Sequence, residues 1–538
     1  MQSSSSQATA AGLAVALSAG FLLFFLALRT NHYSSVDGAL RCLSVFFNGR
    51  QFHGNNHMLY PFLVEQWANL NKLVGNRAKD PFEYLRMSQA MDSFACALSI
   101  GCVCYLIASL AGARAAILGS LLFGFTSATM LQGTSSNEPP AGIFFALFAL
   151  VLLAIGLRYS SIGLMFAAGF LMSLALASYE AAGTVVGAAI LFCFFWPVAK
   201  SAKRMAVLVR LLVTGAGSVL GVVIIYGWAY SSQGVPAAKM LSRFLDTGGG
   251  ASVYTGLDLI PSKILNTSFG LLQWLFNGLP DDYSGIRALI HHPHRLFWGA
   301  VVIAGFGFVG TIGVLAFLAW RGIGSPLPRI QILMIVAICV FIAIPLWAWG
   351  PNNPKMWLFP QAGLVFVVAV GWGLGSLPSR VQHAFTACLL ICLALEVVRN
   401  LPFVIREHTN PTPYLDDAQA VAQIVSPADR IVLDFNETSA LWDTIWGNGR
   451  MKLMLPASNL AEAAEWLERA KDEARAGHGR LFFLGVLQTT RSQWEPFMGA
   501  RVKIPYEFLE EYRQKTQLVK RLKEGDPQGE LREFIPAR

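Results

Sequence analysis

The sequence predicts an α-helical polytopic membrane protein that carries a small soluble α/β domain at its C-terminal end. Two observations lead to this fold class. Hydrophobic residues make up 54% of the 538 residues and charged residues only 14%, and several apolar runs reach the ~18 residues that a membrane-spanning helix requires. After residue 399 the composition changes to that of a soluble segment, in which strand-like and helix-like patterns alternate.

The apolar runs predict about eleven transmembrane helices. The first is Ala11 to Leu28, because the polar residues before it lack the Lys or Arg of a cleavable signal peptide. Four further spans are expected over residues 89–110, 141–157, 162–178 and 358–377, and the others end near residues 130, 196, 230, 320, 347–357 and 398. Residues 1–399 are therefore predicted to form the transmembrane domain.

Two long polar loops, at residues 29–88 and 231–297, interrupt the predicted spans. The short connectors are rich in Lys and Arg, most of all Lys200 to Arg210, and the positive-inside rule places them in the cytoplasm. Both long loops and the C-terminal domain are then expected outside, in the periplasmic or extracellular space of a bacterial inner-membrane protein. The net charge of +9 is spread over these loops without a polybasic patch, so no nucleic-acid partner is expected.

The C-terminal domain, residues 400–538, has the pattern of a small α/β domain. ADRIVLDF and GRLFFLGVL are predicted to be buried strands, with the amphipathic helix NLAEAAEWLERAKDEARAG between them. FLEEYRQKTQLVKRLKEG is predicted to be a polar terminal helix. Because this domain has no Gly-rich phosphate loop and no nucleophile motif, we expect no catalytic site within it.

Three ionisable residues lie beside predicted spans at the outer face. Asp37 follows the first span in VDGALR, Glu138 opens the fourth span in NEPP, and Lys355 stands between two spans in GPNNPKMW. A carboxylate so close to hydrocarbon is costly unless it is solvated or paired, which makes both acidic residues functional candidates. Each residue also has a plainer explanation. Asp37 in SSVDG and Glu138 before Pro139 suit helix N-termini, and a lysine at a span end commonly snorkels to water.

The surroundings of these residues resemble the C-type (GT-C) integral membrane glycosyltransferase superfamily, which includes protein O-mannosyltransferases and the aminoarabinose transferases that act on lipid A. The matching motifs are VDGALR after the first span, the segment FNGRQFHGNNHMLYP that closes on a proline, and SSNEPPAGIFFALFAL at the fourth span. The resemblance covers residues 10–400. In that family the first-loop Asp is the catalytic base, and the match assigns this role to Asp37, with Glu138 as the second catalytic candidate. No acidic residue adjoins Asp37, which leaves a metal site with few ligands.

The first long loop contains further candidates for contacts with donor or acceptor. His53 and His57 lie four residues apart in FHGNNH, and Tyr60 follows shortly after. The two histidines have a spacing that suits a metal on a helix, but Gly54 and Asn55 between them favour a loop. We therefore expect no metal or other cofactor, although the chemistry would tolerate a divalent ion.

Four basic residues are candidates for binding the donor phosphate: Lys355, Arg243, Arg295 and His292. An ammonium, guanidinium or imidazolium group stabilises a phosphate that gains charge as the sugar departs. The same residues in long outer loops are also compatible with a solvated surface.

The predicted function is that of an inverting membrane glycosyltransferase. It would move a sugar from a polyprenyl-phosphate donor to the hydroxyl of a glycan, lipid or protein acceptor at the outer face of the bilayer, with Asp37 as general base. The alternative is a transporter or lipid flippase with Asp37 and Glu138 in the translocation path, which broken spans and charges within the membrane would favour. A third reading is a catalytically inactive scaffold or binding protein.

Overall fold

The computed structural model separates the chain into two compact units. The membrane unit comprises Met1–Thr30, Arg50–Arg77 and Arg86–Thr409, and the C-terminal unit comprises Asn31–Gly49, Ala78–Leu85 and Asn410–Arg538. The residues that the structure describes are 4–29, 42–43, 45–46, 58–196, 204–245, 357–374, 379–409, 413–433, 442, 451–453, 460–485, 487, 491, 505–522 and 530–535.

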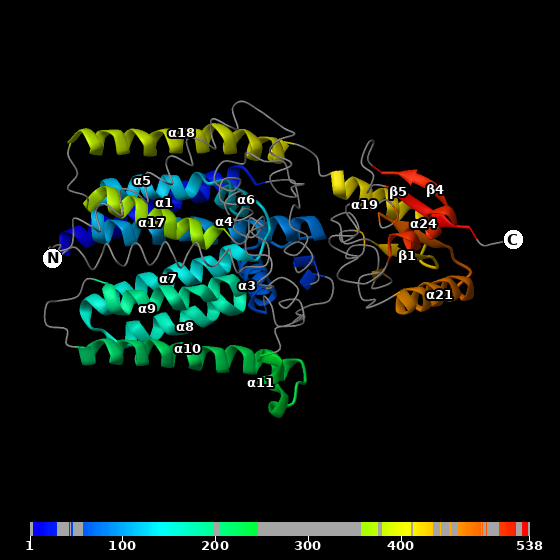
Figure 1. Cartoon of the computed structure of the whole chain (residues 1–538), viewed down its shortest axis with the longest axis horizontal. Helices are drawn as coiled ribbons and strands as arrows, with labels where there is room; N and C mark the ends of the chain where they lie inside the picture. The colour runs from blue at the N-terminus through cyan, green and yellow to red at the C-terminus, as the bar shows by residue number, and fades with distance from the viewer. Residues whose placement is uncertain are drawn as a thin grey trace. The chain divides into compact units, whose positions relative to one another are not determined.

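The described part of the membrane unit is helical (Figure 1). Its elements are α1 (Ser4–Ala27), α3 (Leu59–Leu73), α4 (Pro81–Ala111, which begins in the C-terminal unit), α5 (Ala113–Phe125), α6 (Ser127–Thr134), α7 (Pro139–Tyr159), α8 (Ile162–Ser178), the 3-10 helix η1 (Glu180–Thr184), α9 (Val185–Phe195), α10 (Arg204–Ser232), α11 (Ala237–Leu245), α17 (Leu358–Leu374) and α18 (Ser379–Thr409). Helices α7, α8, α9 and α10 run side by side, and α5 packs against α1, α17 and α18.

These helices confirm a polytopic membrane protein. In the described ranges five helices, α1, α4, α7, α10 and α18, are long and apolar enough to cross a membrane, and the α5–α6 pair makes a sixth if it counts as one span. Helix α8, residues 181–194 and helix α17 are also apolar but are shorter. The spans predicted to end near residue 320 and in residues 347–357 lie outside the described residues, so the total of eleven stays a prediction.

The predicted third span is not one straight helix. Gly112, with a φ of +87°, ends α4 in a conformation that favours glycine and starts the short turn into α5. The helix then stops at Thr126 and resumes as α6, with a bend of 67° between the two parts. The Thr126 side chain accepts a hydrogen bond from the N–H of Thr129 at 3.2 Å, which caps the new helix and stabilises the break.

Helices α8 and α10 approach each other unusually closely, because small residues line their contact. A Cβ atom placed on Gly169 or Gly217 would lie 2.0 or 2.2 Å from a main-chain oxygen of the facing helix. Two side-chain bonds join the helices at the same level: Ser173 Oγ donates to the carbonyl of Ser218 at 2.7 Å, and Ser218 Oγ donates to the carbonyl of Gly169 at 3.1 Å. Packing of small residues with interhelical hydrogen bonds is a common way to join helices in a bilayer.

Substitution of Gly217 by leucine should separate α8 from α10. Overpacking of this kind costs ~1–3 kcal/mol, so Gly217→Leu should lower the midpoint of thermal unfolding in detergent. Gly215→Leu on the same helix is the matched control, because no atom lies within 4 Å of a Cβ at Gly215. Equal midpoints for the two variants would contradict the close contact.

The described part of the C-terminal unit contains a mixed sheet and three main helices. The strands are β1 (Arg430–Leu433), β2 (Met451–Leu453), β3 (Leu481–Leu484), β4 (Thr516–Arg521) and β5 (Glu530–Phe534), in the order β2-β1-β3-β5-β4. β1 pairs in parallel with β2 and β3, whereas β5 pairs antiparallel with β3 and β4. The helices are α19 (Pro413–Ile424), α21 (Leu460–Ala476) and α24 (Tyr506–Gln514). The two predicted strands and the helix between them are thus present as β1, β3 and α21.

The predicted terminal helix is correct only in its first half. The α24 helix ends at Gln514, and the next residues, TQLVKR, form β4 instead of a further helical turn. The apolar residues Leu518 and Val519 are compatible with either a helix or a strand. Backbone pairing with β5 stabilises the strand. The pairing contains a register shift between Leu518 and Lys520, which is a β-bulge or similar irregularity.

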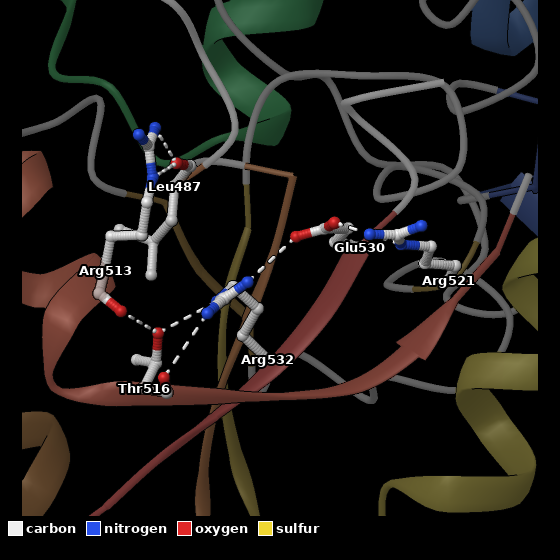
Figure 2. A network of polar contacts seen from close by, with 6 residues as sticks. All are labelled: Leu487, Arg513, Thr516, Arg521, Glu530 and Arg532. Atoms are coloured by element: carbon white, nitrogen blue, oxygen red, sulfur yellow. Dashed lines mark hydrogen bonds and ion pairs between the residues drawn. The ribbon is translucent and has the colours of Figure 1, made fainter. Parts of the chain in front are cut away.

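Polar contacts fix the hairpin of β4 and β5 to the end of α24 (Figure 2). Arg532 donates from Nε to Oγ1 of Thr516 at 3.0 Å, and its Nη1 pairs with Glu530 at 3.0 Å. The other Glu530 oxygen pairs with Arg521 at 3.4 Å. Arg513, near the end of α24, donates from Nε to the carbonyl of Leu487 at 2.6 Å. These contacts tie the antiparallel part of the sheet to the segment that follows β3.

Asp429 joins the starts of β1 and β3. Its carboxylate accepts bonds from the N–H of Ser426 and of Arg480, both at 2.7 Å, and pairs with the Arg480 guanidinium at 3.3 Å. Burial alone would raise the pKa of Asp429, but these hydrogen bonds outweigh it and hold the pKa below the usual value. A carboxyl group with a lowered folded-state pKa stabilises the fold above its unfolded-state pKa, and this contribution disappears as the pH falls through the folded-state value.

The Asp429→Asn variant should therefore be less stable than the wild type at pH 7, by roughly 1.5–3 kcal/mol for hydrogen bonds to a charged group. The difference should vanish once the pH falls well below ~4, the ordinary pKa of aspartate. Limited proteolysis of residues 410–538 in the full-length protein, at pH 7 and at a pH well below ~4, measures this difference in stability. Glu465→Gln, which removes only an exposed pair with Arg469, is the control, and a difference that persisted in acid would contradict this account.

Candidate functional site

Of the residues predicted to form the site, the structure describes the side chains of Tyr60 and Glu138. Arg243 lies on α11, but its side chain is outside the described part. The other predicted residues lie outside the described residues: Asp37, His53, His57, His292, Arg295 and Lys355. Their assignments stay predictions.

Glu138 is completely buried at the start of α7. The helix begins with Pro139 and Pro140, whose missing N–H groups cost nothing at this position. Glu138 occupies the N-cap position, but its side chain makes no capping hydrogen bond and its backbone is already helical, with φ −73° and ψ −34°. The cap explanation is therefore not supported by the contacts of this side chain.

Asp92 is a second buried carboxylate and lies close enough to Glu138 for electrostatic interaction. It is on α4, one of the candidate membrane spans. Its Oδ2 accepts a bond from the Tyr60 hydroxyl at 3.0 Å and another from the N–H of Asn137 at 3.0 Å. Within the described ranges, Asp92 has no basic partner and its Oδ1 has no hydrogen bond. The carboxylate thus joins α3, α4 and the link between α6 and α7.

Two serine hydroxyls complete a buried polar cluster around Tyr60. Ser88 Oγ lies 3.2 Å from the Tyr60 oxygen, Ser136 Oγ lies 3.4 Å from it, and the two serine oxygens are 3.0 Å apart. Because Tyr60 gives its single hydroxyl proton to Asp92, its oxygen acts as an acceptor toward the serines. All the hydroxyls are buried, so their directions are fixed by one another and not by bulk water.

Neighbouring contacts hold the elements of this cluster in place. Trp67 Nε1 of α3 donates to the carbonyl of Met87 on α4 at 2.9 Å. Ser93 of α4 donates to the carbonyl of Gly133 on α6 at 2.7 Å. A Cβ atom at Gly133 would come within 2.8 Å of the Phe25 ring, so a larger residue there would push α6 away from α1.

Sequence reasoning missed Asp92, although a signal was present. An acidic residue inside an apolar run that is long enough to cross the membrane is a functional candidate by the same rule that selected Asp37. The polar residues Ser88, Gln89, Asp92 and Ser93 also recur at helical spacing on one face of α4. Their partners are far away in the chain, and only the fold brings them together.

Within the described ranges, no group of three or more His, Cys, Asp or Glu side chains is placed to hold a metal ion. Asp92 and Glu138 supply two carboxyl groups, and Asp37, His53 and His57 lie outside those ranges. The residues that the structure describes therefore do not by themselves form a metal site.

Several solved structures have the same fold. ArnT from Cupriavidus metallidurans, in a structure bound to undecaprenyl phosphate, matches with a TM-score of 0.54 and 11% identity over 98% of this chain and 98% of that chain. The oligosaccharyltransferase AglB from Archaeoglobus fulgidus, in complex with an inhibitory peptide and a dolichol-phosphate, matches with a TM-score of 0.50 and 13% identity over 97% of this chain and 74% of that chain. The Archaeoglobus fulgidus oligosaccharyltransferase in complex with Zn and sulfate gives a TM-score of 0.50 at 13% identity, over 92% of this chain and 71% of that one.

No family model matches the sequence, and no curated protein matches it significantly. The similarity is therefore one of architecture, and it extends over nearly the whole chain. The protein thus has the fold of ArnT and of the Archaeoglobus fulgidus oligosaccharyltransferase, which agrees with the fold that the resemblance of its motifs implied.

Proposed function

We propose that the protein is a membrane glycosyltransferase that moves a sugar from a polyprenyl-phosphate donor to an acceptor hydroxyl at the outer face of a bacterial inner membrane. The observation that carries this proposal is the fold match to ArnT, a structure bound to undecaprenyl phosphate, over 98% of both chains. The buried acidic residue Glu138, at the start of the fourth predicted span, supports it. The acceptor is a membrane-associated glycan, lipid or protein.

The reaction is a single displacement. Asp37 takes the proton of the acceptor hydroxyl while the acceptor oxygen forms a bond to the anomeric carbon of the sugar. The bond between that carbon and the phosphate oxygen breaks, and the lipid phosphate leaves with the electron pair. Attack from the face opposite the leaving group inverts the anomeric centre. Glu138 would orient the acceptor or Asp37.

Four basic residues would bind the donor phosphate: Lys355, Arg243, Arg295 and His292. Cationic groups that face the leaving oxygen stabilise the charge that develops as the sugar departs. Lys355 is the strongest of these candidates, since the prolines on its N-terminal side, Pro351 and Pro354, restrict its loop. His53, His57 and Tyr60 would contribute to the loop that contacts donor and acceptor.

The experiment that tests the function is an assay of the purified protein in detergent with a radiolabelled polyprenyl-phosphate sugar and extracted membrane acceptors. A new glycosidic product supports the proposal. No product with any donor of this class, from protein that is folded, would contradict it.

A lipid flippase or transporter is the second candidate function. The bent α5–α6 pair and the buried carboxyl groups of Asp92 and Glu138 are features that transporters also use. The detergent assay separates the two functions, because a transporter forms no covalent product and requires two compartments. Movement of labelled lipid across vesicle walls without glycosyl transfer would favour the flippase.

Replacement of Asp37 by asparagine should abolish most of the transfer. Removal of a positioned general base typically lowers the rate by ~10² to 10⁴, while an amide of the same shape should leave expression and donor binding nearly unchanged. Single-turnover assays with the Asp37→Asn variant measure this. Turnover close to that of the wild type would remove Asp37 from the catalytic role.

Replacement of Glu138 by serine distinguishes a site residue from a helix cap. Serine is a good N-cap, so a residue that only starts α7 would tolerate the change. We expect Glu138→Ser to lower turnover by roughly 10-fold or more through loss of orientation. Ser161→Ala is the control, because Ser161 does cap α8 by accepting from the N–H of Leu164 at 3.4 Å. Ser161→Ala should lose stability and keep its activity, and full activity of Glu138→Ser would return Glu138 to a structural role.

A further inference from the structure

We propose that Asp92 is a positioning residue for the glycosyl transfer, which holds Tyr60 and the segment before Glu138 in the geometry that the reaction needs. This inference rests on the proposed function. It adds to that function a carboxylate within a membrane helix that acts through its neighbours and not on the substrate.

The contacts of Asp92 support a positioning role more than a solvated one. Its side chain is completely buried, and one oxygen, Oδ2, receives both described hydrogen bonds. The donors come from two different parts of the chain, 32 and 45 residues away. A single atom therefore fixes the distance between α3 and the link from α6 to α7.

The second donor is adjacent to the candidate catalytic residue. Asn137 gives its N–H to Asp92, and its own side-chain oxygen accepts the N–H of Glu138 at 3.1 Å. The backbone on the N-terminal side of Glu138 is thus attached to α4 through Asp92 before α7 begins. Because misplacement by ~1 Å of a group near the reacting atoms can lower a rate about 10²-fold, this anchor matters for catalysis if Glu138 orients the acceptor or the base.

The first donor extends the same control to Tyr60. The Tyr60 hydroxyl donates its proton to Asp92, so the Tyr60 oxygen can only accept hydrogen bonds from Ser88 and Ser136. Ser136 belongs to the link that also contains Asn137. The carboxylate and the hydroxyl cluster therefore form one network that connects the end of the first outer loop with the start of the fourth predicted span.

The experiment compares Asp92→Ala, Tyr60→Phe and the double variant with the wild type, in the full-length protein in detergent. Alanine is used because the side-chain oxygen of an asparagine could still accept both hydrogen bonds. Asp92→Ala should lower kcat per folded molecule by roughly 10²-fold with a small change in the KM of the donor. Both substitutions remove the hydrogen bond between Tyr60 and Asp92, so their effects should not multiply in the double variant. Glu396→Ala is the matched control. Glu396 is a buried carboxyl group on another membrane helix, α18, and its variant should keep the wild-type kcat.

A purely structural role gives a different result, because it lowers the yield and the thermal midpoint but leaves kcat per folded molecule unchanged. That outcome, or rate losses that multiply in the double variant, would overturn the proposal.

A readout that requires no substrate separates this inference from the proposed function. Hydrogen exchange of a peptide that covers residues 135–138 should become faster in Asp92→Ala than in the wild type, since the N–H of Asn137 loses its acceptor. If the wild type forms no product while exchange responds as expected, the proposed glycosyltransferase function is contradicted. The hydrogen bond between the N–H of Asn137 and Asp92 is then confirmed on its own. If the wild type is active and exchange in this peptide does not change, the positioning role fails and the function stands.

Discussion

A carboxylate can lie inside a bundle of apolar helices only if protein groups replace the water that it has lost. Asp92 meets this condition at Oδ2, which accepts one hydroxyl and one backbone N–H from two different elements, whereas Oδ1 has no hydrogen bond among the described residues. The requirement determines the local structure in turn: α3 must bring its first turn against α4, and the chain must present a free N–H just before α7. The N–H groups of Asn137 and Glu138 precede the first turn of α7 and have no acceptor within the helix, so Asp92 and the Asn137 side chain accept them instead.

The bend at Thr126 belongs to the same arrangement. Because α6 leaves the direction of α5 by 67°, the chain reaches the link of Ser135 to Asn137 through a short helix and not at the end of a straight span. Ser93 then binds the carbonyl of Gly133 at the end of α6. Broken helices often accompany polar sites at membrane depth, because the freed backbone groups become available to other partners. This fact explains why such a break alone does not distinguish an enzyme from a transporter.

The sequence predicted most helices well, because long apolar runs leave few alternatives. The fifth span was expected over residues 162–178, and α8 covers those same residues. Two features of the fold were missed for physical reasons. The break at Thr126 contains no proline and lies within an apolar segment. The strand β4 continues the polar pattern of α24, and it forms by pairing with β5, which the local sequence does not reveal. Tyr60 and Glu138 were selected from the sequence, but Asp92, which connects them, depends on contacts over 32 and 45 residues.

The strand β4 lies at the edge of the described sheet, where backbone N–H and C=O groups would be open to a strand from another molecule. Leu518 and Val519 are both exposed there, which would favour such an addition. The irregular pairing between Leu518 and Lys520 interrupts the regular spacing of these groups, and the positive charge of Lys520 would repel the same edge of a second copy. Both features would oppose edge-to-edge pairing of two C-terminal units, even though two apolar side chains remain exposed on the last hairpin.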